Sequence, residues 1–204
     1  MSDNFDFTDM EWSGFIEATA DIEPTAFHAF AMPLVGSDGD GRQAIDLGFG
    51  GGRDTRVFLA NGWSVYATDV TPEAAQILLS RVDPDQRDRL TIEIGRFHEV
   101  NLPMADLVYA SYSLPFAAGD FEASVDAALA AVRPGGWFAG VFFGVNDEWI
   151  SPEVAAVTRE WIGARFAGWE SIRIDEFDDD GEFGMEGDTK HWHWYFVAAQ
   201  RPRS

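Results

Sequence analysis

The sequence predicts an α/β fold in a single domain, a three-layer sandwich with helices on both faces of a seven-stranded, mostly parallel sheet whose last strand is antiparallel. Short apolar stretches alternate with helical patterns from residue 43 onward, which indicates parallel strands joined by helices. A chain of 204 residues with 46% hydrophobic content is long enough to bury one sizeable core. No helical pattern separates the last two strands, and since a parallel pairing needs a crossover that is usually helical, the final strand is expected to be antiparallel.

The elements follow in order. Residues 11–34 are expected to be helical in two pieces, with Pro24 in a first helical turn, and the sequence GSDGDG at 36–41 is a flexible break. We therefore expect an N-terminal helical cap at 1–41 and a ligand-binding core at 42–204. Strands are predicted at 43–46, 63–68, 90–94, 106–110, 137–143, 171–177 and 191–199. Helices are predicted at 54–61, 72–82, 120–132 and 152–166.

Composition excludes several classes of function. The formal net charge of -21 repels nucleic-acid phosphates, so no nucleic-acid partner is expected. The absence of cysteine excludes disulfides, thiolate zinc sites and cysteine nucleophiles. No apolar run reaches the roughly 18 residues of a membrane span. Residues 1–8 are acidic and lack the basic-then-apolar pattern of an export signal, so we expect a cytoplasmic protein with no membrane partner.

The most informative stretch is AIDLGFGGGRDT at 44–55, which packs four glycines behind a strand that ends near Asp46. A turn between a parallel strand and the next helix faces the ligand crevice of such a sheet. Gly48, Gly50 and Gly52 can adopt positive φ and carry no Cβ, so a ligand can approach the backbone closely. The turn alone is also compatible with a plain connection between two elements.

Asp69 strengthens the prediction of a ligand site. It lies 23 residues after Asp46 at the end of the second strand, in VYATDVTPEA, and so at the same edge of the sheet. A carboxylate at that position typically accepts hydrogen bonds from a ribose diol. It can also cap the helix that starts at Pro72, and the two roles can coexist.

The spacing of the glycines identifies the ligand class. A dinucleotide fingerprint, G-x-G-x-x-G, fails because Arg53 or Thr55 stands where its last glycine is needed. The pattern acidic-x-Gly-x-Gly-x-Gly, with Asp46 as its acid, resembles motif I of the class I, Rossmann-like S-adenosylmethionine-dependent methyltransferases. In that family the first carboxylate serves the cationic amino group of the methionine part. A cationic ligand also explains a carboxylate that would repel a pyrophosphate.

The resemblance extends over residues 43–144. ADLVYASYSLPF at 105–116 and VRPGGWFAGVFFG at 132–144 are similar to the family's fourth and fifth strands, and GRDT and NGWSVYATD are similar to its small-molecule and tellurite-resistance-like branch. The resemblance implies S-adenosyl-L-methionine as methyl donor, with S-adenosyl-L-homocysteine as product. It implies a donor site made by Asp46, Gly48, Gly50, Gly52, Asp69, Val70, Arg96, Phe97 and Ser111.

One position departs from the family. Arg96 stands about where relatives often carry an acid that accepts the adenine amino group, and arginine has no acceptor. Adenine would then be held by backbone and stacking near Phe97, or Glu99 would substitute.

Methyl transfer from a sulfonium is an in-line displacement that mainly needs alignment, which can supply on the order of 7–11 kcal/mol. The predicted catalytic residues are His191 and Tyr112, with His98, His193 and Glu99 as further bases. His191 is placed at the ligand edge if the sixth strand is parallel. It can equally be a sheet residue that alternates with Trp192 and Trp194.

The segment 175–188 is expected to be an acidic loop, either a solvated charge run or a lid that attracts cationic acceptors. No metal is expected, because an EF-hand pattern set on Gly181 would need its terminal glutamate where Gly187 stands.

The resemblance predicts a methyltransferase that acts on a small molecule. Four aromatic residues of the N-terminal segment can cap its acceptor pocket or simply pack on the sheet: Trp12, Phe15, Phe27 and Phe30. Two alternatives stay open, a donor-binding protein without turnover and a nucleotide-dependent oxidoreductase.

Overall fold

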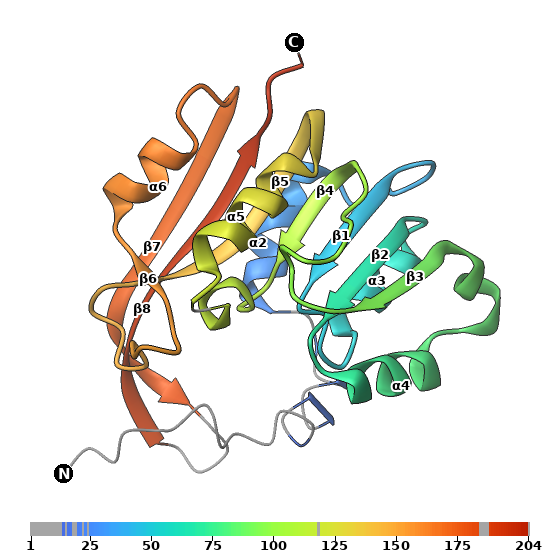
Figure 1. Cartoon of the computed structure of the whole chain (residues 1–204), viewed down its shortest axis with the longest axis horizontal. Coiled ribbons are helices and arrows are strands. Elements are labelled where there is room, and N and C mark those ends of the chain that lie inside the picture. Colours follow the sequence, from blue (N-terminus) through green and yellow to red (C-terminus); the bar gives the residue numbers. More distant parts are fainter. Residues whose placement is uncertain are drawn as a thin grey trace.

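A computed structural model describes residues 14, 16–17, 20–21, 23, 25–117, 119–183 and 188–203. Its centre is one sheet in the strand order β3-β2-β1-β4-β5-β8-β7, with a short strand β6 attached to β5 (Figure 1). This arrangement confirms the predicted α/β class and the mostly parallel sheet.

Five neighbouring strands of the sheet run parallel, and the short β6 also pairs parallel with β5. The five are β1 (Gln43–Leu47), β2 (Ser64–Asp69), β3 (Leu90–Ile94), β4 (Ala105–Ala110) and β5 (Val132–Gly144). Strands β1 and β4 are buried along nearly their whole length, as expected for strands covered on both faces. Because all five run the same way, the carboxyl ends of β1, β2 and β4 lie at one edge of the sheet.

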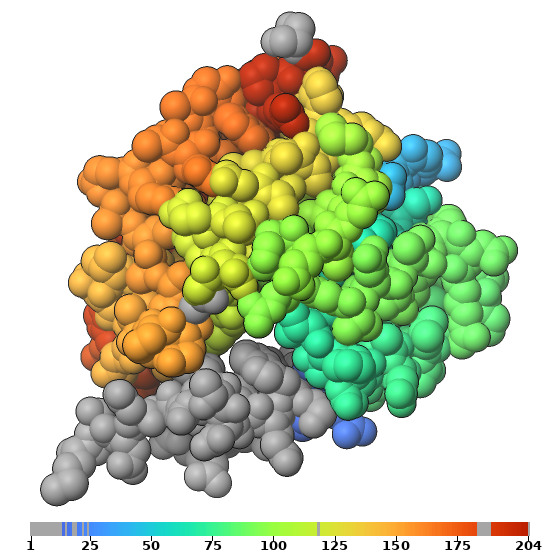
Figure 2. Space-filling model, in the orientation of Figure 1, coloured from blue at the N-terminus to red at the C-terminus, as the bar shows by residue number. Residues whose placement is uncertain are grey.

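Helices cover both faces and form the predicted three layers. One core contains Phe27, Phe58 and Leu78 from helices α2 (Ala26–Val35), α3 (Arg53–Ala60) and α4 (Pro72–Arg81). The other contains Val125 and Ile162 from helices α5 (Phe121–Ala130) and α6 (Arg159–Arg165). In Figure 2 the yellow-green atoms of α5 lie on the near side of the molecule. Two 3₁₀ helices, η1 (Pro84–Arg89) and η2 (Leu114–Phe116), complete the connections.

The predicted helix at 152–166 is shorter than expected. Residues 152–158 instead contain a turn and strand β6 (Ala156–Val157), which pairs with the end of β5. Helix α6 begins after Thr158, whose side chain accepts a hydrogen bond from the Trp161 amide at 3.2 Å. A threonine cap satisfies an otherwise unpaired helical N–H, and this fixes where the helix starts.

The last two strands form a long hairpin. Strands β7 (Ser171–Phe183) and β8 (Asp188–Gln200) pair antiparallel, and β8 also pairs antiparallel with β5. The antiparallel last strand is therefore confirmed. Residues 175–177 belong to the strand predicted at 171–177, and the prediction of an acidic loop is wrong over residues 178–183, which extend β7. In this strand each carboxylate lies opposite a β8 residue, for example Asp180 opposite His191, so cross-strand pairing supports the acidic sequence in extended form.

The N-terminal cap is described in part. Trp12, Phe15 and Pro24 lie outside the described residues. Phe27 and Phe30 lie on α2 and pack against Phe196 of β8, with ring centroids 5.2 and 5.7 Å apart, so both residues belong to the sheet's core. None of the helices in the described ranges is both long and apolar enough to cross a membrane.

Candidate functional site

The glycine-rich turn links β1 to α3 in a conformation that needs its glycines. Gly48 and Gly50 have φ of +73° and +52°. A Cβ on Gly48 would lie 2.3 Å from the Cβ of Ser113, so a side chain there would displace the segment after β4. A Cβ on Gly50 would meet only Ile16, at 3.8 Å. Space is therefore left beside Gly50, where a ligand can approach the backbone.

Asp69, at the end of β2, holds this turn. Its Oδ2 accepts a hydrogen bond from the Gly50 amide at 2.9 Å, and its Oδ1 accepts one from the Thr71 amide, also at 2.9 Å. The second bond lies at the start of α4, so Asp69 also organises the entry to that helix. Each carboxylate oxygen retains a lone pair that can accept a ribose hydroxyl. Val70, the next residue, is exposed.

Asp46 lies beneath the turn and is almost fully buried. The Thr55 hydroxyl donates to its Oδ2 at 2.6 Å. Burial raises the pKa of Asp46 to about 7, and the nearby Asp54 and Asp69 carboxylates add to the shift, against the Thr55 hydrogen bond. The carboxylates of Asp46, Asp54 and Asp69 therefore lie near one another at the start of α3, and Asp46 titrates near neutral pH.

His28, which the sequence did not predict at this site, lies beside Asp54, one of these carboxylates. Asp54 Oδ1 lies 3.3 Å from His28 Nδ1 of α2, yet neither atom has a hydrogen-bond partner among the described residues. The Tyr109 hydroxyl and the Ser111 hydroxyl are buried as well. Arg53 lies 3.6 Å from Asp54. His28 stands in an apolar helical pattern, and no sequence signal singled it out.

The segment after β4 forms the other wall of the site. Ser113 Oγ donates to the Leu47 carbonyl at 2.5 Å and so ties this segment to the end of β1. Tyr112 is the one non-glycine residue with positive φ, 55°, in the described ranges. Its ring makes edge contacts with Trp194 and Phe196 of β8 at 6.3 and 6.2 Å. Burial raises the pKa of Tyr112 to about 12.

The residues after β3 divide into two groups. Phe97 is buried, and its ring tip would be 3.5 Å from a Cβ on Gly48, so it lies against the turn. Arg96 points elsewhere and forms an ion pair with Asp120. Glu99 is exposed, and His98 lies 3.9 Å from both Glu99 and Asp120.

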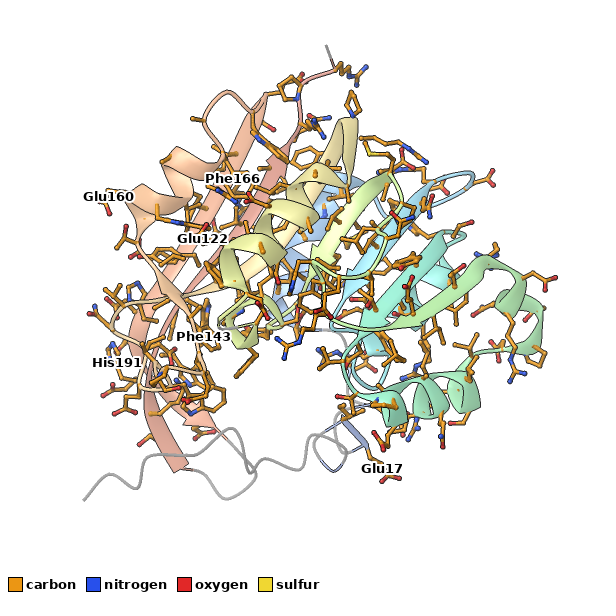
Figure 3. All side chains as sticks on the ribbon, viewed as in Figure 1. Glu17, Glu122, Phe143, Glu160, Phe166 and His191 are labelled. Carbon is orange, nitrogen blue, oxygen red and sulfur yellow. The ribbon has the colours of Figure 1, made fainter. Side chains whose placement is uncertain are left out.

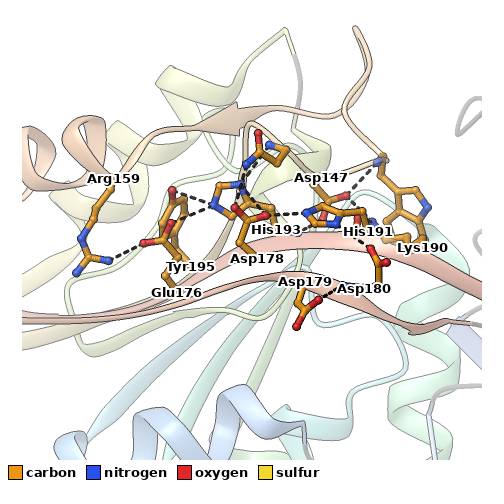
Figure 4. Close-up of polar contacts among 12 residues, drawn as sticks. Asp147, Arg159, Glu176, Asp178, Asp179, Asp180, Lys190, His191, His193 and Tyr195 are labelled. Carbon is orange, nitrogen blue, oxygen red and sulfur yellow. Dashed lines mark hydrogen bonds and ion pairs between the residues drawn. The ribbon is translucent and has the colours of Figure 1, made fainter.

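His191 is held on the hairpin (Figures 3 and 4). Its Nε2 lies 2.7 Å from Asp178 and its Nδ1 lies 2.9 Å from Asp180. The hydrogen bond to Asp178, followed by that to Asp180, raises the pKa of His191. His193 points to the same face and lies 3.0 Å from the Tyr195 hydroxyl. Since side chains alternate along a strand, this face is opposite to the one on which Trp194 meets Tyr112.

Lys190, the single lysine of the chain, is buried near the start of β8, opposite Gly181 of β7. Its ammonium forms an ion pair with buried Asp147 and lies 3.7 Å from the ring centre of Trp192 and 4.5 Å from that of Trp149. Asp147 also accepts the His193 amide at 2.9 Å. The ion pair and the hydrogen bond of Asp147 therefore hold the segment after β5 against β8. Within the described ranges, no group of three or more acidic or histidine side chains is arranged to hold a metal ion.

Comparison with known proteins agrees with this geometry. Residues 45–138 match the family model described as a methyltransferase domain. No curated protein matches the chain.

Solved structures resemble the fold over nearly its whole length. A putative methyltransferase complex with the Trm112 methyltransferase activator from Haloferax volcanii has 18% identity and a TM-score of 0.73, with 95% of each chain covered. Phosphoethanolamine N-methyltransferase 2 of Haemonchus contortus, in complex with S-adenosyl-L-methionine, has 17% identity and a TM-score of 0.72, over 94% of this chain and 56% of that one. TehB from Haemophilus influenzae has 12% identity and a TM-score of 0.71, over 93% of this chain and 67% of that one. Residues 45–138 therefore match the model of a methyltransferase domain, and the fold of the chain is similar to that of solved methyltransferase structures.

Proposed function

We propose that this protein is an S-adenosylmethionine-dependent methyltransferase that acts on a small molecule. The observation that carries the proposal is the bare turn at Gly48–Gly52, held by Asp69 and surrounded by buried carboxylates. A cationic nucleoside amino acid suits this negative, side-chain-free surface, whereas a pyrophosphate would be repelled. The match of residues 45–138 to a methyltransferase domain model supports this proposal.

The residues present fit the donor. Asp69 has lone pairs for both ribose hydroxyls, Gly50 leaves space at the turn, and Phe97 offers a ring against which adenine can stack. At the opposite side of the turn, the unpartnered carboxylate oxygen of Asp54 suits the amino acid end. The bound donor supplies a methyl group already activated by its sulfonium.

The chain's own part in the reaction is alignment. Ser111 and Tyr112 border the place where the methyl group is expected, and the rings of Tyr112 and Trp194 exclude water beside it. With a pKa of about 12, Tyr112 keeps its proton at neutral pH, so we assign it a positioning role. His191 is a weaker candidate base than the sequence suggested, because it lies on the hairpin face opposite to Trp194 and Tyr112 and its raised pKa favours the imidazolium, which cannot accept a proton.

Two observations support a small-molecule acceptor. They are the net charge of -21 and the likeness to a solved structure whose name contains a small molecule. The structurally similar protein of Haemonchus contortus is phosphoethanolamine N-methyltransferase 2, whose name contains a small amine. That acceptor needs no contact with a nucleic acid, which the negative surface would repel.

Calorimetry on the purified protein tests the donor assignment. We expect S-adenosylhomocysteine and S-adenosylmethionine to bind and NAD not to bind. Release of S-adenosylhomocysteine with a panel of small amines, thiols and phenols then separates an enzyme from a binding protein without turnover. Binding of NAD with its pyrophosphate against Gly50 would contradict the proposal.

A further inference from the structure

The β7–β8 hairpin extends past the rest of the sheet. Pairing of β8 with β5 ends at Trp194, whereas pairing of β8 with β7 continues as far as Asp188. Because β5 runs parallel to β4 and β1, its carboxyl end lies at the edge of the sheet that carries the glycine-rich turn. The projecting part of the hairpin, residues 178–183 and 188–193, therefore stands at the same edge as the proposed donor site.

One face of this hairpin carries a row of aromatic rings, which we call the aromatic face. Trp192, Trp194 and Phe196 alternate along β8 and so point to one side, and Phe177 of β7 lies directly opposite Trp194. The rings of Phe177 and Trp194 stack with centroids 4.6 Å apart, and the ring of Trp192 lies 5.2 Å from that of Trp194. Phe177 is 37% exposed, so a ligand can reach the row of rings.

Tyr112 connects the aromatic face to the proposed donor site. It follows Ser111 after the end of β4, and its ring contacts that of Trp194 edge-on at 6.3 Å. Its φ of +55° is unusual for a bulky residue, and such a conformation is costly unless the surrounding structure holds it in place. The aromatic face therefore begins beside the place where the methyl group is expected.

The aromatic face also carries a carboxylate with no ion-pair partner in the described part of the chain. Asp179 lies opposite Trp192, is exposed, and accepts the neighbouring Asp180 amide at 2.8 Å through Oδ1. Figure 4 shows Asp179 on the other side of the strand from His191. Its second oxygen is therefore available to a cationic group that lies on the aromatic rings.

The charges of this face favour a cationic ligand. Its two cations within the described ranges are already paired, Arg173 with Asp175 and Lys190 with Asp147, so neither is free to bind a carboxylate or a phosphate. The Lys190 ammonium lies 3.7 Å from the ring centre of Trp192, which shows that this row of indoles accommodates an alkylammonium. The net charge of -21 attracts cations in addition.

We propose that the aromatic face binds the methyl acceptor, and that the acceptor is a flat aromatic molecule with a cationic side chain, such as an arylalkylamine. Its ring packs against Phe177 and Trp194, its ammonium is directed to Asp179, and the atom to be methylated lies at the opposite end, toward Tyr112. Asp179 is two residues, about 7 Å, beyond Phe177 along the strand, a distance that a short alkylamine side chain can span. This inference rests on the proposed function.

The transfer itself follows from that orientation. A lone pair on the acceptor forms the new bond to the methyl carbon, and the electron pair of the broken carbon–sulfur bond remains on sulfur. A hydroxyl or amine acceptor then gives its proton to water. The ammonium at Asp179 is a binding group and takes no part in these steps.

Ligand pairs that differ only in terminal charge test the inference by calorimetry in the presence of saturating S-adenosylhomocysteine. Tyramine and 3-(4-hydroxyphenyl)propionate share a phenol ring, and tryptamine and indole-3-propionate share an indole ring. The first member of each pair is a cation and the second is an anion, while n-butylamine carries the charge without a ring. We expect the wild type to bind the two arylalkylamines about tenfold more tightly than the two acids and than n-butylamine.

Variants assign the two parts of the site. Phe177→Ala should weaken binding of both arylalkylamines by about fivefold, because it removes ring surface, and Asp179→Asn should weaken them by about threefold without weakening the acids. The matched controls lie on the opposite face of β7. Ile172→Ala changes an exposed apolar residue and Glu182→Gln an exposed carboxylate, and neither should change any of these affinities.

Binding of S-adenosylhomocysteine separates a failure of this inference from a failure of the proposed function. Each variant should bind it as the wild type does, which also shows that the variant is folded. If the wild type binds S-adenosylhomocysteine but holds the acids as tightly as the amines, the acceptor class is wrong while the donor assignment stands. The same holds if Phe177→Ala and Asp179→Asn behave like their controls. If the wild type does not bind S-adenosylhomocysteine, the proposed function fails and this inference fails with it.

Discussion

Asp69 combines two tasks in one side chain, because it fixes the turn through Gly50 and has lone pairs for the ribose. Replacement by Ala removes charge-assisted hydrogen bonds, so we expect donor binding to weaken by about 1–3 kcal/mol. Calorimetry with S-adenosylhomocysteine measures this loss, and a melting curve checks that the variant is folded. An unchanged affinity in the folded variant would refute the ribose assignment.

The raised pKa of Asp46 predicts a dependence of stability on pH. Its folded pKa of about 7 lies above the unfolded value of 3.8, so the folded state binds the proton more tightly. The contribution is complete below about pH 4 and is lost as the pH rises to 7, and it amounts to about 4 kcal/mol as an upper bound.

Urea denaturation of the wild type and of Asp46→Asn at several pH values measures this contribution. The neutral amide cannot ionise, so the variant should gain stability relative to the wild type between pH 4 and 7. A difference between the two proteins that is constant with pH would contradict the shift.

Some residues of the candidate site could be predicted from the sequence and others could not. Asp46, Gly48 and Asp69 were predicted from their positions at strand ends and in the turn, together with the family resemblance of the motif. His28 and Tyr109 could not be predicted, since they reach the site from elements distant in sequence. Their place depends on how α2 packs over β4, which no local pattern encodes.

Among the elements, the β7–β8 hairpin depends on a buried ion pair. Lys190→Ala would leave Asp147 charged and unpaired in the interior, so we expect the free energy of unfolding to fall by about 3–5 kcal/mol. Chemical denaturation measures the loss.

The double variant Lys190→Ala with Asp147→Asn provides the control. It removes the stranded charge and should recover part of the stability, because the amide can still accept the His193 amide proton. A single variant as stable as the wild type would show that the pair contributes nothing.

The bounds of some helices and strands were predicted more accurately than those of others, for a physical reason. Strand β3 alternates apolar and polar residues and is followed by Gly95, and both its ends were placed correctly. The acidic half of β7 resembles a loop by composition, because its strand conformation comes from partners on β8 such as His191 and Tyr195. Helix α6 was overextended, since the Thr158 cap lies inside a continuous helical pattern.

For the whole molecule, the dominant feature is the charge of -21. Mutual repulsion of exposed carboxylates destabilises the compact state, and salt screens it over about 10 Å at 0.1 M and about 3 Å at 1 M. We expect the melting temperature to rise as KCl is increased across this range. Sucrose at matched osmolality controls for solvent effects, and an equal rise in sucrose would argue against charge repulsion.

Because Lys190 is enclosed, the rate of its chemical modification measures local opening of the protein. Since this ammonium is the sole lysine amine, is buried and lies over two neighbouring indole rings, we expect acylating reagents to modify it only when the hairpin separates from the segment after β5. The rate at which that one side chain becomes acetylated, followed by mass spectrometry, thus gives the frequency of a single local opening event without any engineered label.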